Sequence, residues 1–364
     1  MAEVKQILEL WKRAQAAGDE VCLATVVGIE GSAYRRPGAR MLLTASGQRA
    51  GTVSGGCLEG EIAKKAWWLT ETGPSLQRYS SFFDDDGDMP YGLGCGGTVF
   101  VLLERGAAAE ACLEALGRSV EERTASVIVT ATDTNGPGAT NQPGTVLIVR
   151  EDGSTAWQRG ARGPAAAERA ESLARETLQT RGSQTAEPEA SRYFAEYVAP
   201  PPLLWVFGAG DDAQPLVEFA AALGWHVVVA DGRSQLARAE RFPQAARVMD
   251  LEKALTGAGA GDAAVILTHS YEQDRIALGA LLGIDLKYLG ILGPRARTER
   301  LVGEVAPGLG LGSEEILERL HSPVGLDLGA HSPAAIALSI AAELQAVLAG
   351  RGAKKLKVAK MIHG

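Results

Sequence analysis

Two cysteines lie among glycines, where a thiol has little side-chain cover. Cys57 follows two glycines in V-S-G-G-C-L-E-G, and Cys95 lies in L-G-C-G-G. The residues after Cys57 read as a helix, so this thiol is predicted to lie at a helix N-terminus, where free amides and the macrodipole stabilise a thiolate. Gly55 and Gly56 would leave backbone amides bare and let a bulky ligand come close.

A cluster of arginines lies upstream in a turn-rich stretch. The segment G-S-A-Y-R-R-P-G-A-R contains Arg35, Arg36 and Arg40, and guanidinium groups suit phosphate and other anions. Together with Cys57 as a thiolate ligand, they predict a pocket for an anion with a soft, thiol-binding metal centre. The alternative is that the thiols are simply buried.

That alternative is the preferred interpretation for Cys22 and Cys112, which lie inside apolar segments. Glu59 and Glu61, next to Cys57, are interpreted as acids of a first helical turn rather than as catalytic groups.

Bulk composition excludes several classes of protein. The chain has 364 residues, 46% hydrophobic and 22% charged, which is typical of a soluble two-domain protein. A net charge of -8 argues against a nucleic-acid partner. Four cysteines without a C-x-x-C pair predict reduced thiols in the cytoplasm and no structural zinc. The charged amphipathic N-terminus is not a signal peptide, and no apolar run predicts a membrane span.

The pattern of apolar residues predicts an N-terminal α/β domain over 1–182. A Pro-rich linker is expected over 183–202, a Rossmann-like domain with a parallel sheet over 203–350, and a basic tail over 351–364. The predicted strands of the first domain are 21–28, 40–44, 48–53, 98–104, 126–131 and 145–150, and its helices are 4–15, 59–70, 107–121 and 164–179.

The second half begins with a dinucleotide-binding pattern. G-A-G-D-D-A follows the apolar strand L-L-W-V-F, and an acid, Asp231, ends the next strand 21 residues after Gly210. Gly208 would allow the tight turn, Gly210 the approach of a phosphate, and Asp231 would accept from ribose hydroxyls. The alternative is a sheet without a ligand, because Asp211 and Asp212 would repel a pyrophosphate.

Further polar residues fall at the carboxyl ends of later strands, where open α/β sheets bind ligands. Arg233 follows Asp231, and His269 and Arg295 follow the strands predicted at 264–268 and 288–292. These residues complete the predicted site for NAD(P) or another nucleotide, although His269 could instead cap a helix. The apolar helix at 334–348 is expected to dock on the sheet or on a second copy of the chain in a homodimer.

The chain resembles the XdhC/CoxI family, the accessory and maturation proteins of xanthine dehydrogenase and carbon monoxide dehydrogenase. The resemblance covers nearly the whole length, with a weaker stretch between residues 105 and 200. It rests on these motifs: G-S-A-Y-R-R-P-G-A-R-M, G-T-V-S-G-G-C-L-E-G-E, G-L-G-C-G-G-T-V, F-G-A-G, E-R-F-P-Q-A, T-H-S-Y-E-Q-D, L-G-I-L-G-P-R and S-P-V-G-L-D-L-G-A-H-S-P. Two departures are Asp211, where the family often has histidine, and S-P-A-A-I-A, where it often has an acidic residue.

The resemblance implies a chaperone that binds the molybdenum cofactor and delivers it to a xanthine dehydrogenase-type molybdoenzyme. On this interpretation Cys57, and also Cys95, would contact the cofactor or its molybdenum. A cysteine desulfurase is a further expected partner. Two other functions stay open: an NAD(P)-dependent oxidoreductase with His269 as proton donor, and a sulfur carrier that holds a persulfide on Cys57.

Overall fold

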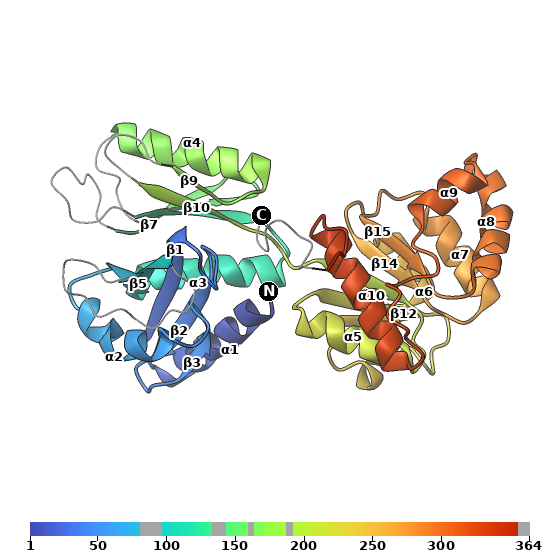
Figure 1. The fold of residues 1–364 in the computed structure, drawn as a ribbon, viewed down its shortest axis with the longest axis horizontal. Coiled ribbons are helices and arrows are strands. Elements are labelled where there is room, and N and C mark those ends of the chain that lie inside the picture. Colours follow the sequence, from blue (N-terminus) through green and yellow to red (C-terminus); the bar gives the residue numbers. More distant parts are fainter. Residues whose placement is uncertain (81–96, 133–142, 159–163, 187–191, 356–364) are drawn as a thin grey trace. The chain divides into compact units, whose positions relative to one another are not determined.

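The structure, a computed structural model, describes residues 1–80, 97–132, 143–158, 164–186 and 192–355. The chain divides into two compact units, the first ending at Pro201 and the second beginning at Pro202. Both units combine helices with sheets (Figure 1), which confirms the predicted α/β class.

Within the described residues, the first sheet of the N-terminal unit is antiparallel, with the strand order β3-β2-β1-β5-β4. Helices α1 (Ala2–Ala17) and α3 (Gly106–Glu121) pack on one face, and α2 (Glu59–Leu69) packs on the other. The register pairs Gly31 with Gly97 at one end of the sheet and Cys22 with Arg105 at the other. The strands are β1 (Val21–Gly31), β2 (Arg40–Thr44), β3 (Arg49–Gly51), β4 (Ser75–Ser80) and β5 (Gly97–Arg105).

A second antiparallel sheet, in the order β8-β7-β6-β10-β9, lies on the far side of α3 (Figure 1). Ile128 and Ile148 on its inner face join the core around α3, and α4 (Pro164–Thr180) covers its outer face. Helix α3 is therefore shared by both sheets. The strands are β6 (Ser126–Ala131), β7 (Gly144–Arg150), β8 (Thr155–Trp157), β9 (Gln184–Ala186) and β10 (Tyr193–Val198).

The predicted linker over 183–202 is wrong at 184–186 and 193–198, because these residues form β9 and β10 of this sheet. Strand β10 pairs with β6 from Tyr193 to Val198, and its Tyr193 and Ala195 are buried. The aromatic and β-branched residues of Y-F-A-E-Y-V suit a strand, but prolines on both sides concealed that signal. The first unit thus extends past residue 182, and β4 and β8 were also missed.

The C-terminal unit is a parallel sheet in the order β13-β12-β11-β14-β15, with helices on both faces. Its strands are β11 (Leu203–Phe207), β12 (His226–Asp231), β13 (Arg247–Asp250), β14 (Ala263–Ile266) and β15 (Tyr288–Ile291). Its helices are α5 (Ala213–Ala222), η1 (Ala239–Arg241), α6 (Leu251–Gly257), α7 (Tyr271–Leu281), α8 (Arg295–Leu309), α9 (Ser313–Arg319) and α10 (Pro333–Leu348). The strand order reverses between β11 and β14, which is where such sheets bind ligands.

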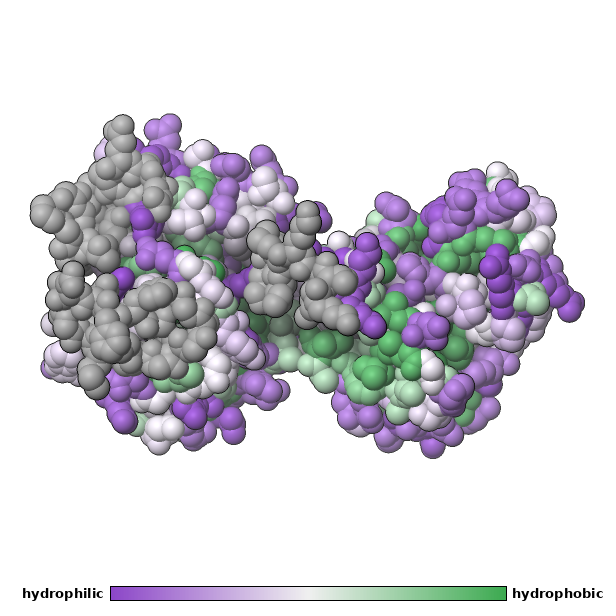
Figure 2. Space-filling view, in the orientation of Figure 1, coloured by the Kyte–Doolittle hydropathy of each residue, from purple (hydrophilic) through white to green (hydrophobic). Residues whose placement is uncertain are grey.

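Helix α10 docks on the sheet beside α5, as one of the two sequence-based alternatives expects. Ala337, Ile340 and Leu344 are buried in the core that includes Leu216 of α5. Figure 2 shows hydrophobic residues at the surface over α10, where Leu338 is 50% exposed. A homodimer remains a prediction. No helix in the described parts of the chain has the length and apolar character that a membrane crossing needs.

Candidate functional site

The Cys57 loop, residues 53–58, connects β3 to α2 and is held from beneath by Glu59. One oxygen of the Glu59 carboxylate accepts from the amides of Val53 (3.1 Å) and Ser54 (2.8 Å), and the other accepts from the Ser54 hydroxyl (2.6 Å). Burial acts to raise the pKa of Glu59, but the hydrogen bonds, with the Ser54 hydroxyl first, outweigh it and hold the pKa below its ordinary value. Glu59 is therefore an ionised anchor of the loop.

Ser54 passes this support on to the rest of the loop. Its Oγ accepts from the amides of Gly56 (3.2 Å) and Leu58 (3.1 Å). Gly56 has a φ of +111°, a conformation that favours glycine. Cys57 comes one residue before the N-cap of α2 and is exposed. The loop thus presents its thiol to solvent at the start of a helix, where the sequence predicts it.

The arginine turn, residues 31–40, is brought against the Cys57 loop by Tyr34. Ring atoms Cγ and Cδ1 of Tyr34 both lie 3.6 Å from the position that a Cβ on Gly55 would occupy. The turn is anchored on β1, because the amide of Gly38 donates to the carbonyl of Val26 (2.8 Å). The thiol and the arginines, more than fifteen residues apart in the chain, therefore belong to neighbouring loops.

The three arginines of this turn have different environments. Arg36 is exposed, and its guanidinium has no hydrogen-bond or ion-pair partner among the described residues. Arg35 forms an ion pair with Glu3. The prediction that Arg40 binds an anion is wrong. Its side chain is 4% exposed and forms a two-pronged ion pair with Glu196, so it cannot reach an external phosphate.

The Arg40–Glu196 pair joins β2 of the first sheet to β10 of the second. Burial acts to lower the pKa of Arg40, but the Glu196 carboxylate outweighs it and raises the pKa above its ordinary value. Close by, buried Glu104 accepts from the amide of Thr145 (2.7 Å). These contacts indicate that Arg40 fixes the two sheets together.

The remaining cysteines separate clearly from Cys57. Cys22 and Cys112 are buried, and burial raises the pKa of each thiol to about 12. Cys95 lies outside the described residues, so its predicted role stays a prediction. Packing explains why residue 97 is a glycine, since a Cβ there would lie 2.2 Å from the carbonyl oxygen of Ser32.

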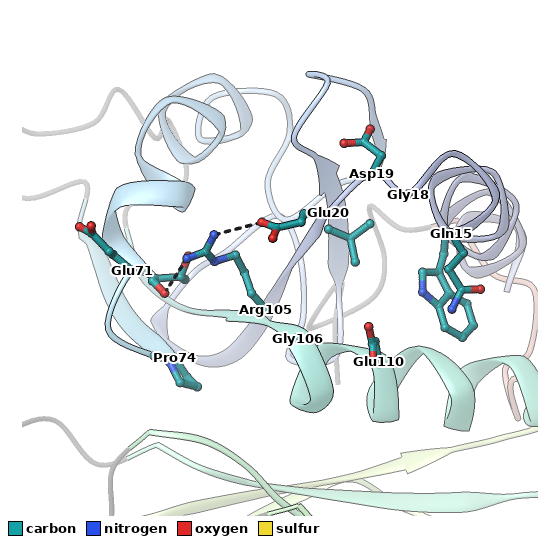
Figure 3. Close-up of a pocket in the computed structure, with 13 residues that line it drawn as sticks. Gln15, Gly18, Asp19, Glu20, Glu71, Pro74, Arg105, Gly106 and Glu110 are labelled. Carbon is teal, nitrogen blue, oxygen red and sulfur yellow. Dashed lines mark hydrogen bonds and ion pairs between the residues drawn. The ribbon is translucent and has the colours of Figure 1, made fainter.

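A hollow of about 770 Å³ lies at the end of the first sheet that is opposite to the arginine turn and the Cys57 loop (Figure 3). Asp19, Glu20, Glu71 and Glu110 give it an acidic lining, and Arg105 crosses it toward Glu20 at 3.6 Å. The hollow is lined by residues just after the C-terminus of α2, whereas Cys57 lies just before the N-terminus of that helix. None of the predicted site residues lines this hollow.

A smaller hollow of about 290 Å³ borders the arginine turn at Pro37. Val27, Ile29, Leu76 and Phe100 give it apolar walls. Glu30, Thr132, Thr185 and Arg192 also line it, so its walls are mixed in polarity.

The glycine-rich turn after β11 has the predicted shape, but its acid faces inward. Gly208 has a φ of +127°, and a Cβ there would lie 2.3 Å from the carbonyl oxygen of Leu267. Asp231 has a fully buried side chain that accepts from the amide of Ala209 (2.9 Å) and from Arg233 Nε (2.9 Å). Burial acts to raise the pKa of Asp231, but these hydrogen bonds, with that of Arg233 first, lower it overall. This corrects the predicted role of Asp231, because its carboxylate is unavailable to a ribose hydroxyl.

Acidic groups occupy the outer side of the same turn. A Cβ on Gly210 would lie 2.5 Å from Oδ1 of Asp212. Asp212 pairs with His269 Nε2 at 2.7 Å, and Asp211 pairs with Arg241 at 2.6 Å. Two carboxylates therefore stand where a dinucleotide would place its pyrophosphate.

The other predicted cations of this unit are engaged with the protein. Arg233 also donates to the carbonyl of Thr268 (2.7 Å), and Arg295 pairs with Glu299 of its own helix at 2.9 Å. Among the residues that the structure describes, no group of three or more histidine, cysteine, aspartate or glutamate side chains is arranged to hold a metal ion.

Three residues of the N-terminal site were not predicted to take part in it: Tyr34, Ser54 and Glu59. Each stands within a motif quoted above. Their roles depend on side-chain directions, which the spacing of the motifs does not contain.

Known proteins match both units. The pattern of the XdhC Rossmann domain matches residues 204–344, and that of the XdhC and CoxI family matches residues 14–80. The chain is 25% identical, over 94% of its length and 88% of the relative's, to the molybdenum cofactor insertion chaperone PaoD of Escherichia coli. A crystal structure of a xanthine dehydrogenase from Bacillus halodurans, 28% identical, matches with a TM-score of 0.72 over 95% of this chain and 97% of that one.

A further relative, from Bacillus subtilis, is a probable subunit of xanthine dehydrogenase. It is 31% identical over 90% of this chain and 92% of its own length. Likeness of this extent, together with the two matching domain patterns, shows that the chain belongs to the XdhC and CoxI family.

Proposed function

We propose that this protein binds the molybdenum cofactor on its N-terminal unit and delivers it to a xanthine dehydrogenase-type apoenzyme. The observation that carries the proposal is its likeness, over nearly the full length of both chains, to a molybdenum cofactor insertion chaperone. The exposed Cys57 thiol and the exposed Arg36 of the neighbouring turn, which has no partner among the described residues, support it, because a soft metal with an anionic tail needs both kinds of group.

Different residues of the N-terminal unit would bind different parts of the cofactor. Cys57 would supply a thiolate to the molybdenum, and Gly55 and Gly56 would let the ligand approach the backbone. Arg36 would pair with the phosphate. Since Glu59 already fixes the loop, little ordering would be needed on binding.

Ligand content tests the proposal directly. Wild type, Cys57→Ala and Cys22→Ala would be purified from a molybdate-replete host that makes the cofactor, and molybdenum and oxidised pterin would be measured. We expect near-stoichiometric amounts in wild type and in the buried-thiol control, and loss in Cys57→Ala. Transfer to an apo-dehydrogenase, scored by its activity, completes the test. Wild type without molybdenum and pterin would contradict the proposal.

A sulfur carrier is a second candidate, favoured by the exposure of Cys57 alone. It predicts that a cysteine desulfurase leaves one extra sulfur atom on Cys57, which intact-protein mass spectrometry would detect without any bound pterin. The oxidoreductase is less well supported, because Asp231 is engaged and Asp211 and Asp212 stand in the phosphate position.

A further inference from the structure

Tyr34 is an unusual residue of the arginine turn, because a large aromatic ring stands in solvent beside the thiol loop. The side chain is 70% exposed. Its ring covers Gly55, two residues before Cys57, with Cγ and Cδ1 at 3.6 Å and Cδ2 at 3.8 Å from the Cβ position of that glycine. Its hydroxyl has no hydrogen-bond partner among the described residues.

The ring rests on two anchored pieces of backbone. Glu59 and Ser54 hold the loop beneath it, and the bond from Gly38 to Val26 holds the turn that carries it. Because Gly55 has no side chain, the ring lies directly over the loop backbone. Burial of an exposed aromatic face against a second ring is favourable, so this position is suited to receive a flat ligand.

We infer that Tyr34 is the stacking platform for the planar ring system of the ligand held at Cys57. The inference rests on the proposed function, and it identifies the ligand's chemical class as a flat heteroaromatic ring that carries a soft centre and an anionic group. The ring stacks on Tyr34, Cys57 contacts the soft centre and Arg36 pairs with the anion. The three groups come from two adjacent loops at one end of the first sheet.

Trp68 provides a matched control. It is 71% exposed, almost the same as Tyr34, but lies near the C-terminus of α2, about 15 Å along the helix from Cys57. If surface aromatics bind a flat ligand without specificity, the loss of either ring would weaken binding equally. If the site is built at the arginine turn, only Tyr34 would matter.

The test is equilibrium binding of molybdenum cofactor, released anaerobically from a molybdoenzyme, to wild type, Tyr34→Phe, Tyr34→Ala and Trp68→Ala, with the bound fraction separated and its molybdenum and oxidised pterin measured. We expect binding to weaken about tenfold in Tyr34→Ala, as for the loss of a base-stacking aromatic, and to stay near wild type in Tyr34→Phe and Trp68→Ala. The alkylation rate of Cys57, measured in a Cys95→Ala background without ligand, should change less than about twofold in Tyr34→Ala, since Glu59 rather than Tyr34 holds the loop.

Each other outcome overturns the inference in a recognisable way. Equal affinity of wild type and Tyr34→Ala shows that the ring does not stack, while the proposed function stands. A parallel loss in Trp68→Ala shows non-specific contact. A loss in Tyr34→Ala with an altered Cys57 alkylation rate shows a structural role only. Wild type that binds no cofactor refutes the proposed function and the inference together.

Discussion

The two glycine-rich loops of this protein, one at Cys57 and one at Gly208, look alike in sequence and are built alike. In each, a buried carboxylate closes the loop from within: Glu59 binds the amides of Val53 and Ser54, and Asp231 binds that of Ala209. The outward groups differ. The first loop presents an exposed thiol and adjoins the turn of Arg36, whose guanidinium has no partner among the described residues, whereas the second presents two aspartates that already have partners.

From these outward groups it follows that glycine spacing indicates where a ligand could approach the backbone, while the outward side chains determine which ligand can bind. A carboxylate at a strand end is especially ambiguous. Asp231 stands at the sequence position of a ribose acceptor, but its side chain turns under the loop and serves as a structural group.

The largest effect is expected on stability, for variants of the arginine turn that remove either the buried arginine, Arg40, or the exposed one, Arg36. Arg40→Ala leaves the nearly buried Glu196 without its partner and should lower the free energy of unfolding by about 3–5 kcal/mol. Arg36→Ala, from an exposed position, should change it by less than about 0.5 kcal/mol but weaken cofactor binding. Urea unfolding with tryptophan fluorescence measures the first effect. Equal stability of the two variants would remove the distinction between inner and outer arginines.

A large difference in alkylation is also expected between the exposed Cys57 and the buried Cys22 and Cys112. With burial raising the pKa of Cys22 and Cys112 to about 12, their thiolate populations at neutral pH fall about a thousandfold below that of an ordinary thiol. In a Cys95→Ala background, iodoacetamide should label Cys57 within the native protein and the other two only after unfolding. Peptide mass spectrometry reads this out, and rapid labelling of Cys112 in the native protein would contradict the assigned burial.

The shared construction of the loops predicts a shared weakness. Glu59→Ala leaves buried amides and the Ser54 hydroxyl unpaired. Asp231→Ala removes the acceptor of the Ala209 amide and of Arg233 Nε, so each substitution should cost about 2–3 kcal/mol. Glu61→Ala, which removes only a surface pair with Lys65, is the matched control. If Glu59→Ala is as stable as Glu61→Ala, Glu59 does not anchor the Cys57 loop.

The stabilisation by Glu59 should also depend on pH in a definite direction. Its pKa in the folded protein lies below the ordinary value of 4.5, so its contribution is fully present above pH 4.5 and is lost as the pH falls through the folded pKa. The difference in unfolding free energy between wild type and Glu59→Gln should therefore be constant near neutrality and narrow in acid. A gap that widens in acid would show that the pKa is raised instead.

The smallest effect is expected at the outer side of the second loop. Asp211→Asn with Asp212→Asn removes two negative charges from the start of α5, where helix amides favour anions. We expect NADH, titrated by calorimetry, to bind wild type weakly or undetectably and to bind the double variant several-fold more tightly. Tight binding to wild type would revive the predicted dinucleotide site.

Much of the fold was open to prediction because hydrophobic spacing is local. The β2 strand was predicted with its bounds unchanged, and α2, α3 and α10 were predicted within one residue at each end. The missed strands are β4, β8, β9, β10 and β13, which are short or flanked by prolines and depend on pairing with another strand. Of these, β10 pairs with β6, which lies far earlier in the chain. Strand β10 was taken as linker for this reason.

The family, the parallel sheet and the placement of Cys57 on a glycine loop before a helix are all readable from the residues in order, because they depend on local spacing and residue type. Which charges face outward depends instead on packing in three dimensions. Arg36 and Arg40 lie four residues apart in one turn, but one stands in solvent and the other is committed to Glu196 across two sheets. That choice belongs to packing, since a buried charge must find its partner wherever the fold supplies one.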